Sequence, residues 1–306
     1  MVASRGNVRK RSLQERLWRG RIAYLMLLPT FVLLFVFLYY PAFMGLYRSL
    51  FKWSAGAEAK FIGLDNFVAL FSKDKVFMAS LGHMVQLAAW YLFSTLAISL
   101  AMAVLLHRLR RLGLKYFFRL LTVLPVVIPA IVILMLWKFI YDASIGPLNA
   151  LLITVGLDEW TRAWLSDPNT ALYAVMLRNF PWTDGVATLI LLAGFQAIPT
   201  EVVESSMIDG AGGLRRFWSI ELPLVAGQIR LVTVLTIIWS IQEFTAIFAL
   251  TQGGPINSTM VPGMWMYWNA FSINKMGYAS AIGVVMFAIT MILTVINMRY
   301  ITTQDN

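Results

Sequence analysis

Long runs of apolar residues, separated by polar segments, form the dominant pattern along this chain. A helix that crosses a bilayer needs about 20 mostly apolar residues. Six runs meet that requirement: residues 22–40, 84–106, 117–140, 171–192, 228–250 and 278–301. The pattern therefore predicts an all-α polytopic membrane protein with six transmembrane helices, in which a polar tail over residues 1–21 precedes one membrane domain over residues 22–306.

Three of these runs contain residues that are unusual inside a membrane. Pro125 and Pro129 interrupt the third run, Pro181 and Asp184 interrupt the fourth, and Glu243 lies inside the fifth. Transmembrane helices tolerate proline where neighbouring groups satisfy the backbone that it frees. All three runs therefore remain predicted spans.

The segment between the first two runs, residues 41–82, has a helical pattern of its own. Phe61, Leu64, Phe67, Leu70 and Phe71 recur at helical spacing. This predicts a short amphipathic helix on the outer surface. A packed loop without a helix is the alternative that the pattern leaves open.

Composition agrees with a membrane protein and excludes several other classes. Of the 306 residues, 59% are hydrophobic and 13% are charged, whereas a soluble domain carries about 25% charged residues. An ordinary soluble enzyme and a disordered chain are therefore excluded, and the absence of cysteine excludes a disulfide scaffold.

The positions of the basic residues predict the orientation, because short cytoplasmic loops carry an excess of Lys and Arg. The tail and the loop between the second and third runs are strongly basic. They contain Arg5, Arg9, Lys10, Arg11, Arg16 and Arg19, and Arg108, Arg110, Arg111 and Lys115, respectively. Both termini are therefore predicted to be cytoplasmic. The net charge of +10 then reflects topology and contact with anionic lipid, not a nucleic-acid partner.

The connection between the fourth and fifth runs, residues 195–227, is unusually long for a compact helical bundle. Its pattern predicts a helix from about Pro199 to Ile208, a glycine turn at Gly210, and a second short helix that ends near Pro223. Two helices lying across the membrane face form a docking surface for a partner protein. A hairpin that only covers the bundle is the alternative.

The spacing of residues in this loop carries a family resemblance. It reads E-S-S, three residues, G, nine residues and I-E-L-P, which resembles the EAA motif of ABC-transporter permeases. Two serines replace the two alanines, and both are small enough to keep the packing close. The resemblance implies that residues 195–227 form a loop that couples to an ATPase subunit, called the coupling loop below. The implied coupling residues are Glu204, Ser205, Ser206, Asp209, Gly210, Ala211, Ile220, Leu222 and Pro223.

Further stretches resemble the sugar-importing, binding-protein-dependent permeases of the maltose-permease type. They are FIGLDNF from Phe61, LSDPNTALYAV from Leu165 and LTQGGPINST from Leu250. The resemblance covers the chain after residue 20 and implies a type I importer permease, the first subunit of a heterodimeric pair. The implied partners are a second permease, two ATP-binding subunits and an external solute-binding protein, and the implied location is the inner membrane of a prokaryote.

The sequence itself indicates that another subunit binds the ATP that drives transport. It contains no G-x-x-x-x-G-K-[ST] phosphate loop, so ATP and Mg²⁺ would be bound by a partner subunit. We therefore expect a transport subunit that is not an enzyme and holds no cofactor or metal of its own.

Polar groups inside the fourth and fifth runs are the candidates for the transport path, because a charge at the bilayer centre costs about 2.5–3.5 kcal/mol or more. In the maltose-type family, the positions of Asn179, Trp182, Thr183, Thr236, Ser240, Gln242 and Glu243 line a sugar site. Asp184 is added because its carboxylate accepts hydrogen bonds from hydroxyl groups. A sugar needs such partners together with an aromatic plane, and Trp182 would supply that plane.

Two other interpretations remain open at this point. Arg178, Asp184 and Glu243 could be inter-helix ion pairs with no contact to a substrate. Alternatively, Asp184 and Glu243 could be ion sites of a secondary transporter, although six spans show no inverted repeat and the coupling loop would have no role. The two acids favour a neutral sugar over an anion, and Arg178 weakens that preference.

Overall fold

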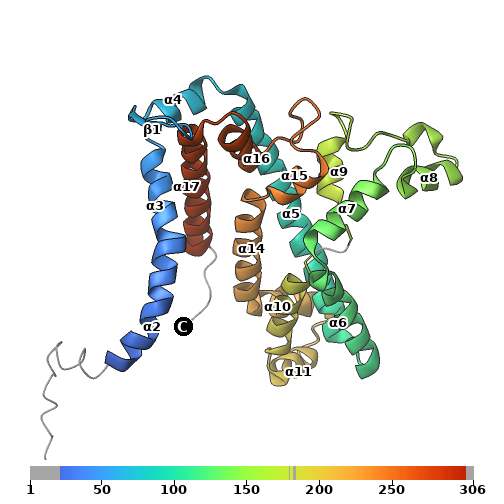
Figure 1. The fold of residues 1–306 in the computed structure, drawn as a ribbon. Helices are drawn as coiled ribbons and strands as arrows, with labels where there is room; N and C mark the ends of the chain where they lie inside the picture. The colour runs from blue at the N-terminus through green and yellow to red at the C-terminus, as the bar shows by residue number, and fades with distance from the viewer. Residues whose placement is uncertain (1–20, 179, 182–183, 301–306) are drawn as a thin grey trace, which may run out of the picture.

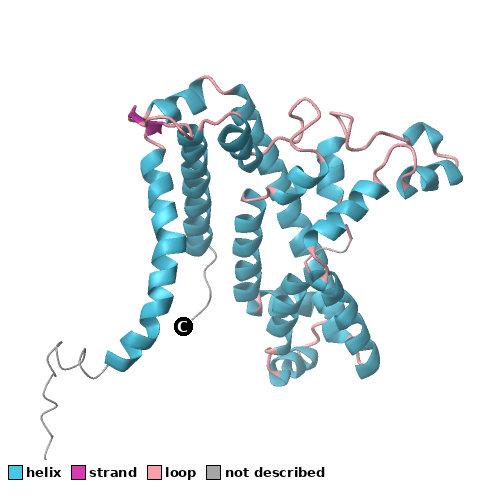
Figure 2. Ribbon diagram, in the orientation of Figure 1, coloured by secondary structure: helices cyan, strands magenta, loops and turns pink. Residues whose placement is uncertain are grey.

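The computed structural model describes residues 21–178, 180–181 and 184–300, and these are mostly helical (Figures 1 and 2). Long helices run side by side between two ends of the molecule. Figure 1 shows the short elements β1, α4 and α16 at one end and α11 at the other. The basic tail before residue 21 lies outside the described residues.

The first long helix extends beyond its predicted end. It comprises α2 (Arg21–Leu34), a π-helical turn η1 (Phe35–Tyr39) and α3 (Tyr40–Arg48). The wide turn ends two residues before Pro41, whose ring would clash with a carbonyl of the preceding turn in a regular α-helix. The apolar side chains of this first long helix are exposed, as expected for a surface that meets lipid or another membrane subunit. Near its end, α3 packs against α17.

The outer segment contains the predicted short helix, which begins later than its pattern indicates. A two-stranded hairpin of β1 (Phe51–Lys52) and β2 (Lys60–Phe61) precedes α4 (Asp65–Ser72). Leu70 on α4 is fully buried and joins a cluster with Phe77 and with Ile282 of α17 (Met276–Tyr300). Apolar burial therefore holds α4 to the top of the bundle.

The helix α5 (Lys75–Arg108) is the central element of the fold and contains the second predicted span. It begins at Asp74, whose side chain accepts a hydrogen bond from the Phe77 amide at 2.9 Å. α5 packs most extensively against α10 and α14. One core cluster joins these three helices through Leu106, Leu191 and Val232.

Three predicted spans are discontinuous. The third divides into α6 (Leu112–Val127) and α7 (Ala130–Ile140), bent by 93° at Pro129, because proline disfavours helical backbone at the preceding residue. The fourth divides into α9 (Ala171–Leu177) and α10 (Gly185–Gln196), and the fifth into α14 (Ala226–Ile241) and α15 (Thr245–Leu250). The breaks in the fourth and fifth runs coincide with the polar clusters.

Among the described residues, three helices are long and apolar enough to cross a membrane: residues 21–48, 75–108 and 276–297. Three bent helix pairs would bring the number to six if each pair formed one span. These pairs are 112–127 with 130–140, 185–196 with 200–208, and 213–224 with 226–241. Short elements connect the helices at the end of the molecule that carries β1 and α4 (Figure 1). They are α8 (Pro147–Thr154), η2 (Asp158–Trp160), α16 (Pro262–Tyr267) and η4 (Trp268–Ser272).

The coupling loop folds as two short helical segments. The first is α11 (Thr200–Ile208), bent by 67° from α10. The second comprises α12 (Gly213–Arg216), the π-turn η3 (Phe217–Glu221) and α13 (Leu222–Leu224), and is bent by 68° from α14. Figure 1 shows α11 at the same end of the molecule as the first residues of α2.

Candidate functional site

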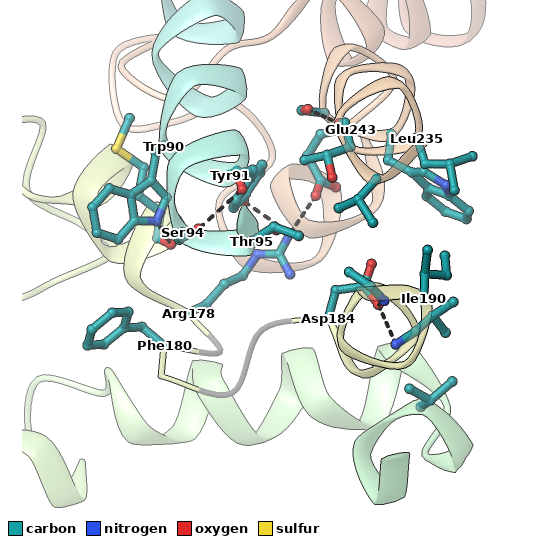
Figure 3. Close-up of a pocket in the computed structure, with 18 residues that line it drawn as sticks. Trp90, Tyr91, Ser94, Thr95, Arg178, Phe180, Asp184, Ile190, Leu235 and Glu243 are labelled. Atoms are coloured by element: carbon teal, nitrogen blue, oxygen red, sulfur yellow. Dashed lines mark hydrogen bonds and ion pairs between the residues drawn. The ribbon is translucent and has the colours of Figure 1, made fainter. Parts of the chain in front are cut away.

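A central cavity of about 540 Å³ opens where the fourth and fifth predicted spans are broken. Its walls come from α5, α9, α10 and α14, and Figure 3 shows charged and aromatic side chains around it. Four of the predicted sugar-site residues line it: Asp184, Thr236, Ser240 and Glu243. Asn179, Trp182 and Thr183 lie outside the described residues.

Asp184 faces the cavity and also caps a helix. Its Oδ1 accepts hydrogen bonds from the amides of Val186 at 2.8 Å and Ala187 at 3.2 Å, at the start of α10. A carboxylate at this position satisfies free amides and faces the positive end of the helix dipole. The break in the span thus explains an acid at this depth without requiring a partner cation.

Glu243 has the same relationship to the second broken helix. Its Oε1 accepts a hydrogen bond from the amide of Ala246 at 3.1 Å, in the first turn of α15. Its Oε2 pairs with the guanidinium of Arg178, which follows directly after α9. The two side chains are only 17% and 13% exposed, respectively, so each charge needs its partner.

Arg178 also contacts the long central helix. Its Nη2 donates a hydrogen bond to the hydroxyl of Tyr91 at 3.1 Å, and the guanidinium lies 5.5 Å from the centre of the Tyr91 ring. Within the part of the chain that the structure describes, the buried Nε of Arg178 has no hydrogen-bond partner. One arginine therefore connects α5, α9 and the break before α15, as Figure 3 shows. Arg178 and Glu243 thus form an ion pair, whereas Asp184 pairs with no cation among the described residues.

The remaining residues of the fifth run divide between two faces. Thr236 and Ser240 lie four residues apart on α14 and so share its cavity face, and Glu243, beyond the end of the helix, lines the same cavity. The hydroxyl of Ser240 donates to the backbone carbonyl of Thr236 within the helix. Gln242 does not line this cavity; it lines a separate one of about 480 Å³ together with Phe244 and Tyr267. The helix ends at Ile241, so the chain leaves the helical register there.

Several lining residues were missed by the sequence interpretation. Trp90, Tyr91, Ser94 and Thr95 of α5, and Trp239 of α14, line the cavity. The indole nitrogen of Trp90 donates to the carbonyl of Met176 at 2.6 Å, which fixes the ring between α5 and α9. The second run carries no charge, so no costly group drew attention to it. The polar-aromatic group W-Y-x-x-S-T within it was the available signal.

The turn of the coupling loop explains the glycine of the motif. Gly210 has φ +74°, a left-handed conformation that other residues adopt at a cost. The Gly210 amide donates a hydrogen bond to the carbonyl of Met207 at 3.1 Å, and the Ala211 amide donates one to the carbonyl of Ser206 at 2.9 Å. This pair of bonds is the Schellman arrangement that ends many helices.

The serine substitutions in the motif fit the structure. Ser206 is 4% exposed, and its hydroxyl donates to the carbonyl of Val203 at 2.6 Å, so the buried polar group is satisfied. Ser205 is exposed and bonds the carbonyl of Val202. Small side chains therefore keep α11 close to the bundle without an unpaired hydroxyl.

The outward side of the coupling loop is apolar as well as acidic. Met207, Ile208, Leu214 and Trp218 are 54%, 86%, 76% and 61% exposed. Glu204 and Asp209 are also exposed. Exposed apolar side chains flanked by charged ones are typical of a protein docking surface. We call Met207, Ile208, Leu214 and Trp218 the docking patch.

Comparison with known proteins identifies the class to which this fold and site belong. The structure is similar to a bacterial ABC transporter that imports the acidic polysaccharide alginate, with a TM-score of 0.85 and 21% identity. That similarity covers 96% of this chain and 99% of the other chain. The fold is therefore that of a type I ABC importer permease.

The sequence comparison defines the family. Residues 94–303 match the family described as "Binding-protein-dependent transport system inner membrane component", and the chain belongs to that family. It is 36% identical to the probable ABC transporter permease protein YurN of Bacillus subtilis, covering 92% of this chain and 96% of YurN. It is 31% identical to the sulfoquinovosyl glycerol transport system permease protein SmoG of Agrobacterium fabrum, covering 93% and 91%, respectively.

Family membership confirms the prediction of an ABC importer permease in the inner membrane and not the alternative of an ion-coupled secondary transporter. The geometry agrees, because Glu243 pairs with Arg178 and Asp184 caps α10. Neither acid therefore needs a transported ion to explain its position.

Proposed function

We propose that this chain is one permease subunit of an ATP-driven importer that carries a sugar inward from an external binding protein. The complex would contain a second permease and two ATP-binding subunits. The observation that carries the proposal is the combination of a polar-aromatic cavity between broken helices with an exposed docking patch at one end of the same bundle.

The chemistry of the cavity supports a sugar as the substrate. A sugar presents hydroxyl groups at its edges and an apolar ring face. The indoles of Trp90 and Trp239 supply flat apolar surfaces, and Ser94, Thr95 and the Asp184 carboxylate supply hydrogen-bonding groups. Pockets of a few hundred Å³ with an apolar lining and a few polar groups are typical of small-molecule sites. Asn179, Trp182 and Thr183 remain predicted members of the site, while Gln242 is a weaker candidate because it faces another cavity.

The charge balance of the cavity favours an uncharged sugar. Arg178 is the cation of the described lining, and Glu243 neutralises it. The carboxylate of Asp184 remains, next to the amides at the start of α10. A sugar acid or sugar phosphate would meet an acid in this wall without a free cation to bind it.

The docking patch supports the role of the coupling loop. In this proposal, Met207, Ile208, Leu214 and Trp218 enter a cleft of an ATP-binding subunit, and Glu204 and Asp209 contact basic groups at its rim. Burial of apolar side chains would supply most of the affinity. The partner would bind ATP and Mg²⁺, so this chain would need no cofactor.

Reconstitution tests the proposal directly. The chain would be expressed together with candidate permease, ATPase and binding-protein partners from the same genome, purified and placed in proteoliposomes. A thermal-shift screen of the binding protein against glucose, maltose, cellobiose and glycerol 3-phosphate would choose the probe. We expect uptake of a neutral sugar that requires ATP inside and loaded binding protein outside. Uptake by this chain alone on an ion gradient would contradict the proposal.

A further inference from the structure

The coupling loop contains a buried acid that the docking surface does not use. Glu221, in the turn η3, is 3% exposed. It is the second residue of the I-E-L-P segment that ends the motif. A buried carboxylate is costly unless it is paired and hydrogen-bonded, so its partners identify its role.

Two arginines from different parts of the chain pair with Glu221. The Nε of Arg216, from the same loop, lies 2.9 Å from Oε1, and the Nη2 of Arg108 lies 3.2 Å from Oε2. Arg108 also donates to the carbonyl of Gly213 at 3.4 Å, where α12 begins. Each carboxylate oxygen thus has its own cation, one inside the loop and one outside it.

The outside partner belongs to the helix that lines the central cavity. Arg108 is the last residue of α5, and the same helix carries Trp90, Tyr91, Ser94 and Thr95 into the cavity wall. A cation at the carboxyl end of a helix is also favoured by the helix dipole. One continuous helix therefore joins the Glu221 pair at one end to the cavity wall.

Packing around the pair joins the same elements. Phe217 stacks on Phe195 of α10 with ring centres 6.4 Å apart. Phe217 and Leu222 pack against the cluster that includes Leu106 of α5 and Val232 of α14. A movement of the second half of the coupling loop would therefore meet a packed wall, which transmits displacement because close-packed interiors are not compressible.

We propose that Glu221 is a positioning residue that connects the coupling loop to α5 through Arg108, so that movement of the loop moves the wall of the cavity. Arg216 holds the carboxylate in place from within the loop. The inference rests on the proposed function, because a loop that docks no ATPase has no movement to transmit. It adds a specific route: docking patch, η3, Glu221, Arg108 and α5.

The test uses the complete transporter and reports on α5 directly. The chain has no cysteine, so cysteines introduced at Phe93 of α5 and Phe287 of α17 would carry the only spin labels on this subunit. Both positions are exposed, at 66% and 56%. The distance between the labels is measured without nucleotide and after trapping with ATP and vanadate. This readout requires no knowledge of the sugar.

Three variants are compared in this labelled background. Glu221→Gln removes the charge and keeps the shape. Arg108→Gln removes only the outer partner and leaves Glu221 paired with Arg216. It should therefore destabilise the fold less than Glu221→Gln does. Arg215→Gln is the matched control, because it removes the charge of an exposed arginine in α12, next to Arg216 in the coupling loop.

We expect the parent and Arg215→Gln to show the same nucleotide-dependent shift between two distances. In Arg108→Gln and Glu221→Gln, the shift in the equilibrium between the two distances should fall by about fivefold or more, the lower end of typical allosteric coupling. Retention of the ATPase subunits during purification and an unchanged unfolding midpoint for Arg108→Gln would separate lost transmission from lost assembly.

An unchanged shift in Arg108→Gln, with the subunits assembled, would overturn the inference while leaving the proposed function intact. A parent complex that binds no ATPase, or takes up no sugar with ATP, would instead remove the proposed function. The two failures are therefore distinguishable in one set of preparations.

Discussion

The guanidinium of Arg178 pairs with the carboxylate of Glu243 where two membrane helices are broken. Arg178 follows the last residue of α9, and Glu243 precedes the first turn of α15. Because Tyr91 accepts a hydrogen bond from the same arginine, the pair also fixes the position of α5. Two broken helices and one continuous helix thus meet at a single ion pair in the wall of the central cavity.

This geometry predicts strongly non-additive mutations. Arg178→Gln or Glu243→Gln alone leaves a poorly solvated charge without its partner, which costs about 3–5 kcal/mol of stability. The double variant removes both charges and should lose much less than the sum. Unfolding of the four proteins in lipid nanodiscs by denaturant gives the double-mutant cycle. Additive losses would show that the two charges do not stabilise each other.

The role of Asp184 is tested by two substitutions that differ in one property. Asp184→Ala removes the oxygen that caps α10 and should cost about 0.5–2 kcal/mol. Asp184→Asn keeps an accepting oxygen and should lose little stability. If the carboxylate also binds the sugar, Asp184→Asn lowers uptake although it folds normally. Uptake equal to that of the parent would limit Asp184 to a capping role.

Asp184 and Glu243 illustrate what the sequence could and could not reveal. Hydropathy located the runs, and the cost of placing a charge inside the bilayer marked Asp184 and Glu243 as special. The pattern does not specify where a helix breaks, so the capping roles were not predicted. The same limitation affects Gln242, which follows the last residue of α14 and faces a different cavity from Glu243.

The coupling loop was the most predictable part of the chain, because fixed spacing carries its structure. The helix up to Ile208 and the turn at Gly210 are both present. The partners of Glu221 were not foreseen, since Arg108 lies 113 residues away in the chain. Contacts over such separations follow from helix packing, which a single sequence does not reveal. The aromatic wall of α5 escaped prediction for a related reason, because tryptophan and tyrosine also occur as membrane-interface anchors.

Gly210 supplies a prediction for the loop itself. Because its φ is +74°, Gly210→Ala places a side chain in the left-handed region at a cost of about 1–2 kcal/mol. Gly212→Ala is the matched control, since Gly212 has φ −60° and open space around it. We expect only Gly210→Ala to reduce the unfolding free energy and the ATPase activity of the complex. Equal effects would show that the turn conformation is not the cause.

The docking patch gives the sharpest test of the ATPase partner. Ile208 is 86% exposed at the end of α11, and its burial in a partner would contribute about 1.5–3 kcal/mol. Ile208→Ser should therefore weaken capture of the ATP-binding subunit by about ten- to a hundredfold. Ile256→Ser is the matched control, because Ile256 is 88% exposed in the loop between α15 and α16 at the opposite end of the molecule.

The measurement is the affinity of the immobilised permease pair for the purified ATP-binding subunit, determined with both variants in the same lipid nanodiscs. The free chain should fold equally well with either substitution, because both side chains are exposed to solvent. A difference in capture then reports on contact and not on stability. If Ile256→Ser weakened capture as much as Ile208→Ser, the ATPase would not dock on α11, and the coupling role assigned to residues 195–227 would be wrong.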